Sequence, residues 1–304
     1  MFKGWNQPIL VAGVLAIACT TSVRAQQDSL EGVFRSSIDY VSITAVVRDQ
    51  RGRPVSSLSR EDFQVLDAGE PRQVLDLRAE SSAPASVALL VDGSGSMRIG
   101  GADAVSIRIS DAILDSLDAR RDDAALFTFD TRLLTLQDFT HDLEAVRGKL
   151  DSVEAWGSTS LFDAIGGTAG LVAQRTQNRR AVVVLTDGGD NASAYTAAQV
   201  AAVASSIDVP VYVFAVVTGG QTTSAPGHNA LADLAYLTGG SFYVTHDEAS
   251  LDSNIQALVE ELRHQYVVAF ESAAEPGWRT VQLTTRNHSY RIRARSGYRA
   301  GAGD

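Results

Sequence analysis

The sequence predicts an α/β fold in which a doubly wound, mainly parallel β-sheet is accompanied by a small flanking β-sandwich. Through the middle of the chain, continuous apolar runs alternate with helical segments, which is typical of a parallel sheet covered on both faces. Before and after that middle part, shorter segments alternate apolar and polar residues, as half-buried strands do. The composition of the 304 residues, with 45% hydrophobic and 20% charged, is that of a globular protein.

The first 25 residues are typical of an export signal. Lys3 supplies a positive start, and residues 9–18 form an apolar run without a charge. The residues that follow suit signal peptidase and predict cleavage after Ala25. Because the run is too short for a good membrane span, we expect no transmembrane segment in the mature chain. The exported protein would act in the periplasm, outside the cell or at the cell envelope. The alternatives for this segment are a buried helix or a retained anchor.

Cys19 offers a second interpretation of the same segment. Residues 15–19 loosely resemble the bacterial lipoprotein signal, in which the cysteine receives a lipid anchor. That signal prefers leucine three positions before the cysteine, where this chain has Ala16. Cleavage after Ala25 is therefore favoured, and a lipid anchor at Cys19 remains the alternative. Since Cys19 is the only cysteine, its removal leaves the mature protein without a disulfide or a thiolate metal site.

The chain is acidic, with 36 Asp and Glu residues against 26 Lys and Arg residues and a formal net charge of −10. Cleavage after Ala25 removes Lys3 and Arg24, which leaves 24 basic against 36 acidic residues and a charge of −12. An acidic chain repels phosphate backbones, and the sequence has no basic stripe with interleaved aromatic residues. Nucleic acid is therefore not an expected partner.

Residues 26–82 are expected to form an N-terminal β region. Segments with the pattern of strands occur at 38–47, 63–66 and 74–77, with turn-forming residues at 49–54 and 67–70. Residues 81–84 have the composition of a linker.

The α/β domain is expected over residues 83–264. Its buried strands are continuous apolar runs, and its helices carry apolar residues every three to four positions. The expected strands are 87–91, 124–129, 133–136, 181–185, 211–217 and 241–244. The expected helices are 105–117, 143–153, 161–175, 196–206, 230–237 and 248–263. Right-handed crossovers between parallel strands then place helices on both faces of one sheet.

Strand patterns return in residues 265–304. The expected strands are 265–270, 280–285 and 290–294. This C-terminal segment is too short for a good independent sheet. We therefore expect it to pack with the N-terminal β region, so that the α/β domain interrupts one small β-sandwich.

Oxygen-bearing side chains gather at the expected strand ends, where open α/β sheets bind ligands. Two of these side chains are carboxylates and three are hydroxyls, which are hard donors that suit Mg²⁺, Mn²⁺ or Ca²⁺ rather than zinc or copper. Glycines separate the first three residues, so that a tight turn can point all three inward where bulkier neighbours would clash. We expect a divalent cation, with Mg²⁺ the first choice, and an open position that attracts an outside carboxylate. The candidate metal ligands are Asp92, Ser94, Ser96, Thr159 and Asp187.

This arrangement resembles the metal-ion-dependent adhesion site of von Willebrand factor type A domains, which have a Rossmann-like fold. The resemblance rests on Asp-x-Ser-x-Ser at 92–96, a loop threonine at Thr159 and Thr-Asp-Gly at 186–188, and it covers about residues 83–264. It implies that the five candidates complete the site, and that Mg²⁺ bridges the domain to a glutamate or aspartate of a partner protein. A weaker likeness to exported bacterial proteins with such a domain rests on residues 60–65, 263–266 and 296–298.

The neighbouring residues leave alternatives open. The aspartates and serines could form a structural turn network without an ion. Ser160 could take the place of Thr159, although the resemblance favours Thr159. Asp190 and Asn191 either orient the loop after the third buried strand or are solvated turn residues. Asp130, at the end of a strand, is typical of a cap or a turn residue.

Binding explains this site better than catalysis. The sequence contains no Gly-x-Ser-x-Gly nucleophile elbow, no His-Glu-x-x-His zinc motif and no phosphate-binding loop with a lysine. We therefore expect an exported adhesion or assembly module and not an enzyme. Two alternatives remain. One is a metal-independent envelope scaffold that acts through its β-sandwich, and the other is a hydrolase whose bound ion activates water.

Overall fold

The computed structural model describes residues 40–79, 83–153, 157–177, 179–206, 208–216, 226–245, 247–272 and 275–301. The predicted export signal, with Cys19 and the cleavage site at Ala25, lies outside these residues. Among the described helices, none combines the length and the apolar character needed to cross a membrane.

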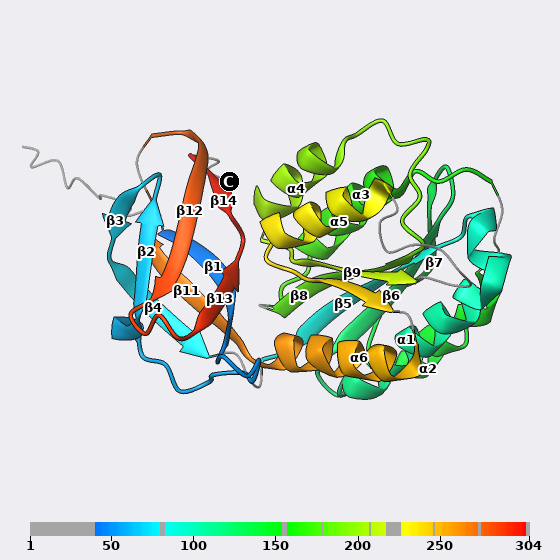
Figure 1. Cartoon of the computed structure of the whole chain (residues 1–304), viewed down its shortest axis with the longest axis horizontal. Helices are drawn as coiled ribbons and strands as arrows, with labels where there is room; N and C mark the ends of the chain where they lie inside the picture. Colours follow the sequence, from blue (N-terminus) through cyan, green and yellow to red (C-terminus); the bar gives the residue numbers. More distant parts are fainter. Residues whose placement is uncertain are drawn as a thin grey trace, which may run out of the picture. The chain divides into compact units, whose positions relative to one another are not determined.

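A six-stranded sheet forms the centre of the α/β domain, in the order β10-β9-β8-β5-β6-β7 (Figure 1). Neighbouring strands are parallel except for β6 and β7, which are antiparallel. The strands are β5 (Ala85–Asp92), β6 (Asp123–Phe129), β7 (Leu133–Thr140), β8 (Arg179–Thr186), β9 (Val211–Val216) and β10 (Phe242–Thr245). The chain adds strands to one side of β5 first and then to the other. The carboxyl ends of β5 and β8 therefore meet at the point where such sheets bind ligands.

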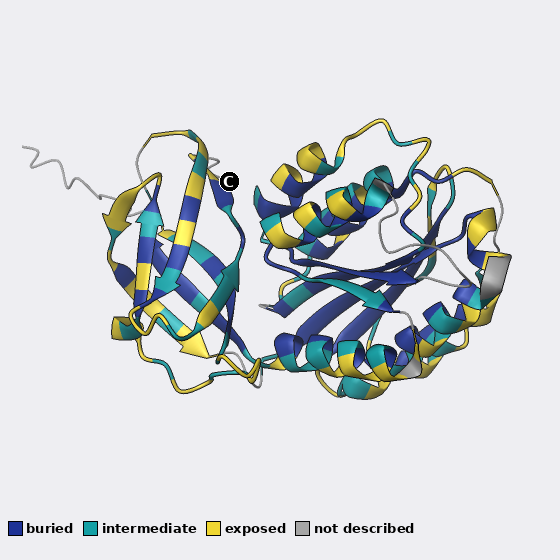
Figure 2. Ribbon diagram, in the orientation of Figure 1, coloured by how far each residue is buried: buried dark blue, intermediate teal, exposed yellow. Residues whose placement is uncertain are grey.

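Helices cover both faces of this sheet (Figure 1). The α-helices are α1 (Ala102–Ser116), α2 (Leu143–Arg147), α3 (Leu161–Ala173), α4 (Ala197–Ser206), α5 (Pro226–Leu237) and α6 (Glu248–Arg263). Val87 and Leu89 of β5 belong to the core formed with α1, α2 and α6. Ala88 and Leu90 belong to the core formed with α3, α4 and α5. Since successive side chains of a strand point to opposite faces, one continuous apolar run supplies two cores, and β5 is buried throughout (Figure 2).

Two four-stranded antiparallel sheets form a β-sandwich, in the orders β13-β1-β11-β4 and β14-β12-β2-β3. The strands are β1 (Tyr40–Arg48), β2 (Phe63–Asp67), β3 (Glu70–Arg72), β4 (Val74–Ala79), β11 (Gln265–Glu271), β12 (Gly277–Thr285), β13 (Arg291–Ala294) and β14 (Gly297–Ala300). β1 pairs with β11 and β13, and β2 pairs with β12. Each sheet thus combines strands that precede the α/β domain with strands that follow it. Ile43, Phe63 and Phe270 share the core between the two sheets.

The predicted fold class is confirmed, but three local predictions are wrong. The helix predicted at 143–153 ends at Arg147, and the chain continues through a turn into the short 3₁₀ helix η3 (Leu150–Ser152). Gly148 follows α2 directly, and glycine is a poor helix former. β3 begins inside the turn predicted at 67–70, and β14 is absent from the prediction. Both strands are too short to show a periodic pattern.

Candidate metal centre

The first motif lies at the buried end of β5. Asp92 and Ser94 are each 1% exposed, and the amide of Ser94 donates a hydrogen bond to Oδ1 of Asp92 at 2.8 Å. The hydroxyl oxygens of Ser94 and Ser96 lie 3.0 Å apart. This turn therefore gathers one carboxylate and two hydroxyls beyond the strand. A Cβ at Gly95 would meet no atom within 4 Å, so the turn has room for a methyl side chain at this position.

Thr186, the last residue of β8, holds the other carboxylate oxygen of Asp92. Its hydroxyl donates to Oδ2 of Asp92 at 2.5 Å and accepts a hydrogen bond from the amide of Gly188 at 3.0 Å. Because β5 and β8 are adjacent, the two strand ends fix the orientation of this carboxylate together. Thr186 is not among the five predicted ligands, although its place at a strand end was a usable signal.

Asp187 follows Thr186 and brings a second carboxylate to the same edge of the sheet. It is half-buried, and its Oδ1 accepts a hydrogen bond from the amide of Gly189 at 3.2 Å. The pKa of Asp92 is raised to about 6, chiefly by burial and in small part by the charge of Asp187, while the hydrogen bonds from Thr186 and Ser94 act in the opposite direction. A buried carboxylate with a second carboxylate nearby makes a region of negative potential that a cation would relieve.

Thr159 lies in the loop before α3 and is 4% exposed. Its amide donates to Oδ1 of Asn191 at 2.9 Å, and its carbonyl accepts from the amides of Asn191 and Ala192 at 3.0 and 3.1 Å. The amide of Leu161 donates to Oδ1 of Asp190 at 2.9 Å. Asp190 and Asn191 are therefore not simple solvated turn residues. They tie the loop that carries Thr159 to the loop that carries Asp187.

Ser160 and Asp130 complete the surroundings of this loop. The amide of Ser160 donates to the carbonyl of Asp130 at 2.7 Å, and the buried Ser160 precedes α3 without a capping hydrogen bond from its side chain. Its hydroxyl therefore remains an alternative to that of Thr159. The carboxylate of Asp130 accepts from the amide of Arg132 at 2.9 Å, and this bond lowers the pKa of Asp130. Asp130 is thus a turn residue, as the sequence suggests.

The turn after Asp187 packs closely against the start of α5. Gly188 has φ +92°, and a Cβ there would lie 2.6 Å from Cδ2 of His228. A Cβ at Gly227 would lie 2.1 Å from the carbonyl oxygen of Gly188. His228 is buried and its ring centroid lies 5.6 Å from that of Phe242. The side chain of His228 therefore packs against the turn that follows Asp187, a role that its position in the sequence could not reveal.

The five candidate ligands are connected by different kinds of interaction. Hydrogen bonds link Asp92, Ser94 and Ser96, and the charge of Asp187 acts on Asp92. Thr159 lies on a loop bonded to the loop of Asp187. Across the described ranges, no group of three or more His, Cys, Asp or Glu residues could hold a metal. A site here would therefore combine two carboxylates with hydroxyl oxygens, and such hard donors fit Mg²⁺, Mn²⁺ or Ca²⁺.

Comparison with known proteins agrees with this fold. Residues 87–189 match the family model of the von Willebrand factor type A domain, and no curated protein matches the chain. A von Willebrand factor type A structure from Catenulispora acidiphila aligns with a TM-score of 0.50 and 11% identity, over 88% of this chain and 76% of that chain. Proximal thread matrix protein 1 from the mussel byssus aligns with a TM-score of 0.51 and 17% identity, over 65% of this chain and 51% of that chain. These matches support the type A resemblance at the level of the fold.

Proposed function

We propose that the chain is an exported adhesion or assembly module that binds a partner protein through a divalent cation. The ion is Mg²⁺ in the first instance, with Mn²⁺ or Ca²⁺ as alternatives, and the partner supplies an aspartate or glutamate carboxylate. The observation that carries the proposal is the buried carboxylate of Asp92, fixed by two strand ends and repelled by the charge of Asp187. The proposed ligands are Asp92, Ser94, Ser96, Thr159 and Asp187.

Each residue has a distinct part in this proposal. Asp92 and Asp187 supply the negative charge, directly or through water, and three hydroxyls supply neutral oxygens. A divalent cation that is held by only a few charged protein ligands stays electrophilic, so it attracts a further carboxylate. Thr186 keeps the Asp92 carboxylate in one orientation. Asn191 keeps the loop of Thr159 in place.

Binding, rather than catalysis, suits this set of groups. The proposal uses Asp92 and Asp187 to hold the ion, and the nearby carboxylates of Asp130 and Asp190 accept hydrogen bonds from the backbone amides of Arg132 and Leu161. General acid and base catalysis would need a further group within hydrogen-bond reach of a substrate. Export is supported by the sequence of residues 1–25. A hydrolase and a metal-independent scaffold remain the competing functions.

Calorimetric titration of the purified protein with Mg²⁺ and Mn²⁺ tests the proposal. We expect binding that disappears in Asp92→Ala, because the variant lacks the carboxylate fixed between β5 and β8. Asp252→Ala is the matched control, since Asp252 is an exposed carboxylate on α6 that pairs with Arg108 at 3.1 Å. Circular dichroism should show that both variants keep the fold. An unchanged Mg²⁺ affinity in Asp92→Ala would refute the assignment of the site.

A further inference from the structure

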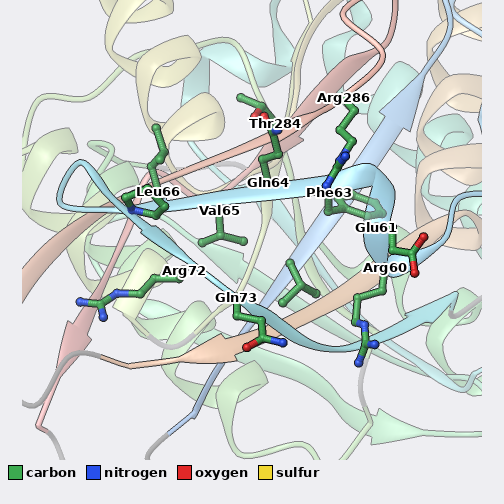
Figure 3. Close-up of a pocket in the computed structure, with 12 residues that line it drawn as sticks. Arg60, Glu61, Phe63, Gln64, Val65, Leu66, Arg72, Gln73, Thr284 and Arg286 are labelled. Atoms are coloured by element: carbon green, nitrogen blue, oxygen red, sulfur yellow. The ribbon is translucent and has the colours of Figure 1, made fainter.

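A groove opens in the wall of the β-sandwich beside β2 (Figure 3). β3 pairs with β2 only from Val65 to Asp67, and after Arg72 the chain crosses to the other sheet, where Val74 pairs with β11. Beyond β3, therefore, β2 has a strand partner only on the side of β12. The two sheets separate at this corner and leave a groove of about 570 Å³. That volume lies within the range of pockets that hold ligands.

The floor of the groove is apolar. Phe63, Val65 and Val74 line it, and all three are buried members of the sandwich core. In Figure 3, Val65 lies between β2 and the segment that carries Gln73. An apolar side chain from a ligand would therefore extend the core of the sandwich and remove its own surface from water.

The rim of the groove is basic, although the chain as a whole is acidic. Its charged lining residues are three arginines and one glutamate, in a chain of net charge −10. Arg60 donates to the carbonyl of Leu75 at 3.1 Å, which leaves most of its guanidinium donors available. The guanidinium of Arg286 makes no hydrogen bond within the described part of the chain. The pKa of Asp62 is lowered mainly by hydrogen bonds from Ser59, and the charge of Arg286 adds to this effect.

We propose that this groove binds an extended peptide segment of a partner protein, in which acidic residues stand on both sides of an apolar residue. The apolar side chain would lie on Val65 and Val74. The acidic side chains would pair with the guanidinium groups of Arg60 and Arg286 and with the terminal nitrogens of Arg72, whose Nε lies 3.3 Å from the buried carboxylate of Asp67. The interaction needs no metal ion, so it is separate from the site at the end of β5.

The shape and the polar groups of the groove favour a peptide over a small anion. Arg72 and Arg60 lie toward opposite ends of the groove, with Val65 between them (Figure 3). The side-chain amide of Gln73 makes no hydrogen bond to other described residues and can pair with a peptide backbone. Peptides commonly bind beside incomplete sheet edges in this way. The acidic net charge of the chain does not prevent an acidic peptide from binding, because repulsion from distant carboxylates is screened over about 8–10 Å at physiological salt.

Fluorescence anisotropy tests the proposal, with the purified protein in chelator. The probe is a labelled Gly-Glu-Glu-Val-Glu-Glu-Gly peptide, and its lysine analogue is the control peptide. We expect the acidic probe to bind and the lysine analogue not to bind. Arg60→Ala and Arg286→Ala should each weaken binding about two- to fivefold, as exposed ion pairs do. Arg299→Ala is the matched control, because Arg299 is exposed on β14 in the same sandwich and does not line the groove.

A second variant tests the shape of the groove independently of its charge. Gln73 is exposed, so Gln73→Trp should keep the fold, fill the opening and abolish binding. Asp92→Ala should bind the probe as the wild type does. The proposal is overturned if the acidic probe does not bind, or if the arginine variants bind it unchanged. It is also overturned if inorganic phosphate or phosphatidylglycerol vesicles displace the probe completely, because the groove would then recognise charge alone.

Discussion

At the scale of single residues, the buried charge of Asp92 destabilises the metal-free protein at neutral pH, and a bound cation would offset this cost. Its carboxylate is buried, and two hydrogen bonds do not compensate fully for the loss of water. Its pKa in the folded protein is about 6, against an ordinary value of 3.8 for an aspartate. In the metal-free protein, the contribution of Asp92 to stability is therefore largest where its carboxyl is protonated. That contribution falls as the pH rises from about 4 to 6, and the loss is complete above this range.

Replacing Asp92 with asparagine should separate stability from metal binding. Without metal at pH 7.5, Asp92→Asn should raise the free energy of unfolding by roughly 2 kcal/mol, since the buried charge is gone. The same variant should lose the stabilisation that Mg²⁺ gives to the wild type. Thermal melts at pH 5 and pH 7.5, with chelator and with Mg²⁺, measure both effects. Asp130→Asn is the control of opposite sign, because hydrogen bonds lower the pKa of Asp130. A metal-free Asp92→Asn protein less stable than the wild type at pH 7.5 would contradict this account.

At the scale of elements, the sequence predicts the ends of strands better than the contacts between loops. The continuous apolar runs before Asp92 and Asp187 place both carboxylates at one edge of the sheet, and the structure has them there. The hydrogen bond from Thr186 to Asp92 and the packing of His228 against Gly188 could not be found in this way, since each joins separate segments of the chain. The same limit applies to β3 and β14, whose three or four residues form strands only because β2 and β12 lie beside them.

The hydrogen bond between the amide of Thr159 and the side chain of Asn191 joins the loops of Thr159 and Asp187, and its role in metal binding can be tested. Asn191→Ala removes the acceptor for the amide of Thr159, so the threonine hydroxyl should lose its fixed position. Mg²⁺ affinity should fall about ten- to a hundredfold, the usual effect of losing a residue that orients a ligand. Calorimetry measures the change. Asn287→Ala is the matched control, because Asn287 caps a turn in the β-sandwich. Equal Mg²⁺ affinities in the two variants would show that this hydrogen bond has no role in the site.

At the scale of the whole described chain, the sandwich depends on the α/β domain that interrupts it. α6 leads directly into β11, and both sheets need strands from before and after the domain. The sandwich is also joined to α6 by charge. Glu261 is 3% exposed, and its carboxylate accepts hydrogen bonds from Arg48 of β1, at 3.1 Å, and from Arg293 of β13. The two parts should therefore unfold together rather than in sequence.

Removing this carboxylate tests whether α6 and the sandwich are coupled. Glu261→Ala leaves the guanidinium groups of Arg48 and Arg293 without their shared partner, and breaking a buried ion pair in this way costs about 3 kcal/mol or more. The neighbouring Glu260 is the matched control. It lies 3.7 Å from Arg48 with 37% of its side chain exposed, so Glu260→Ala should cost less than about 1 kcal/mol. Urea denaturation followed by tryptophan fluorescence and circular dichroism measures both variants. If Glu261→Ala produced two separate transitions, the carboxylate would be the contact that makes unfolding cooperative. If it cost no more than Glu260→Ala, the ion pairs would contribute nothing to stability, and the coupling would rest on the paired strands alone.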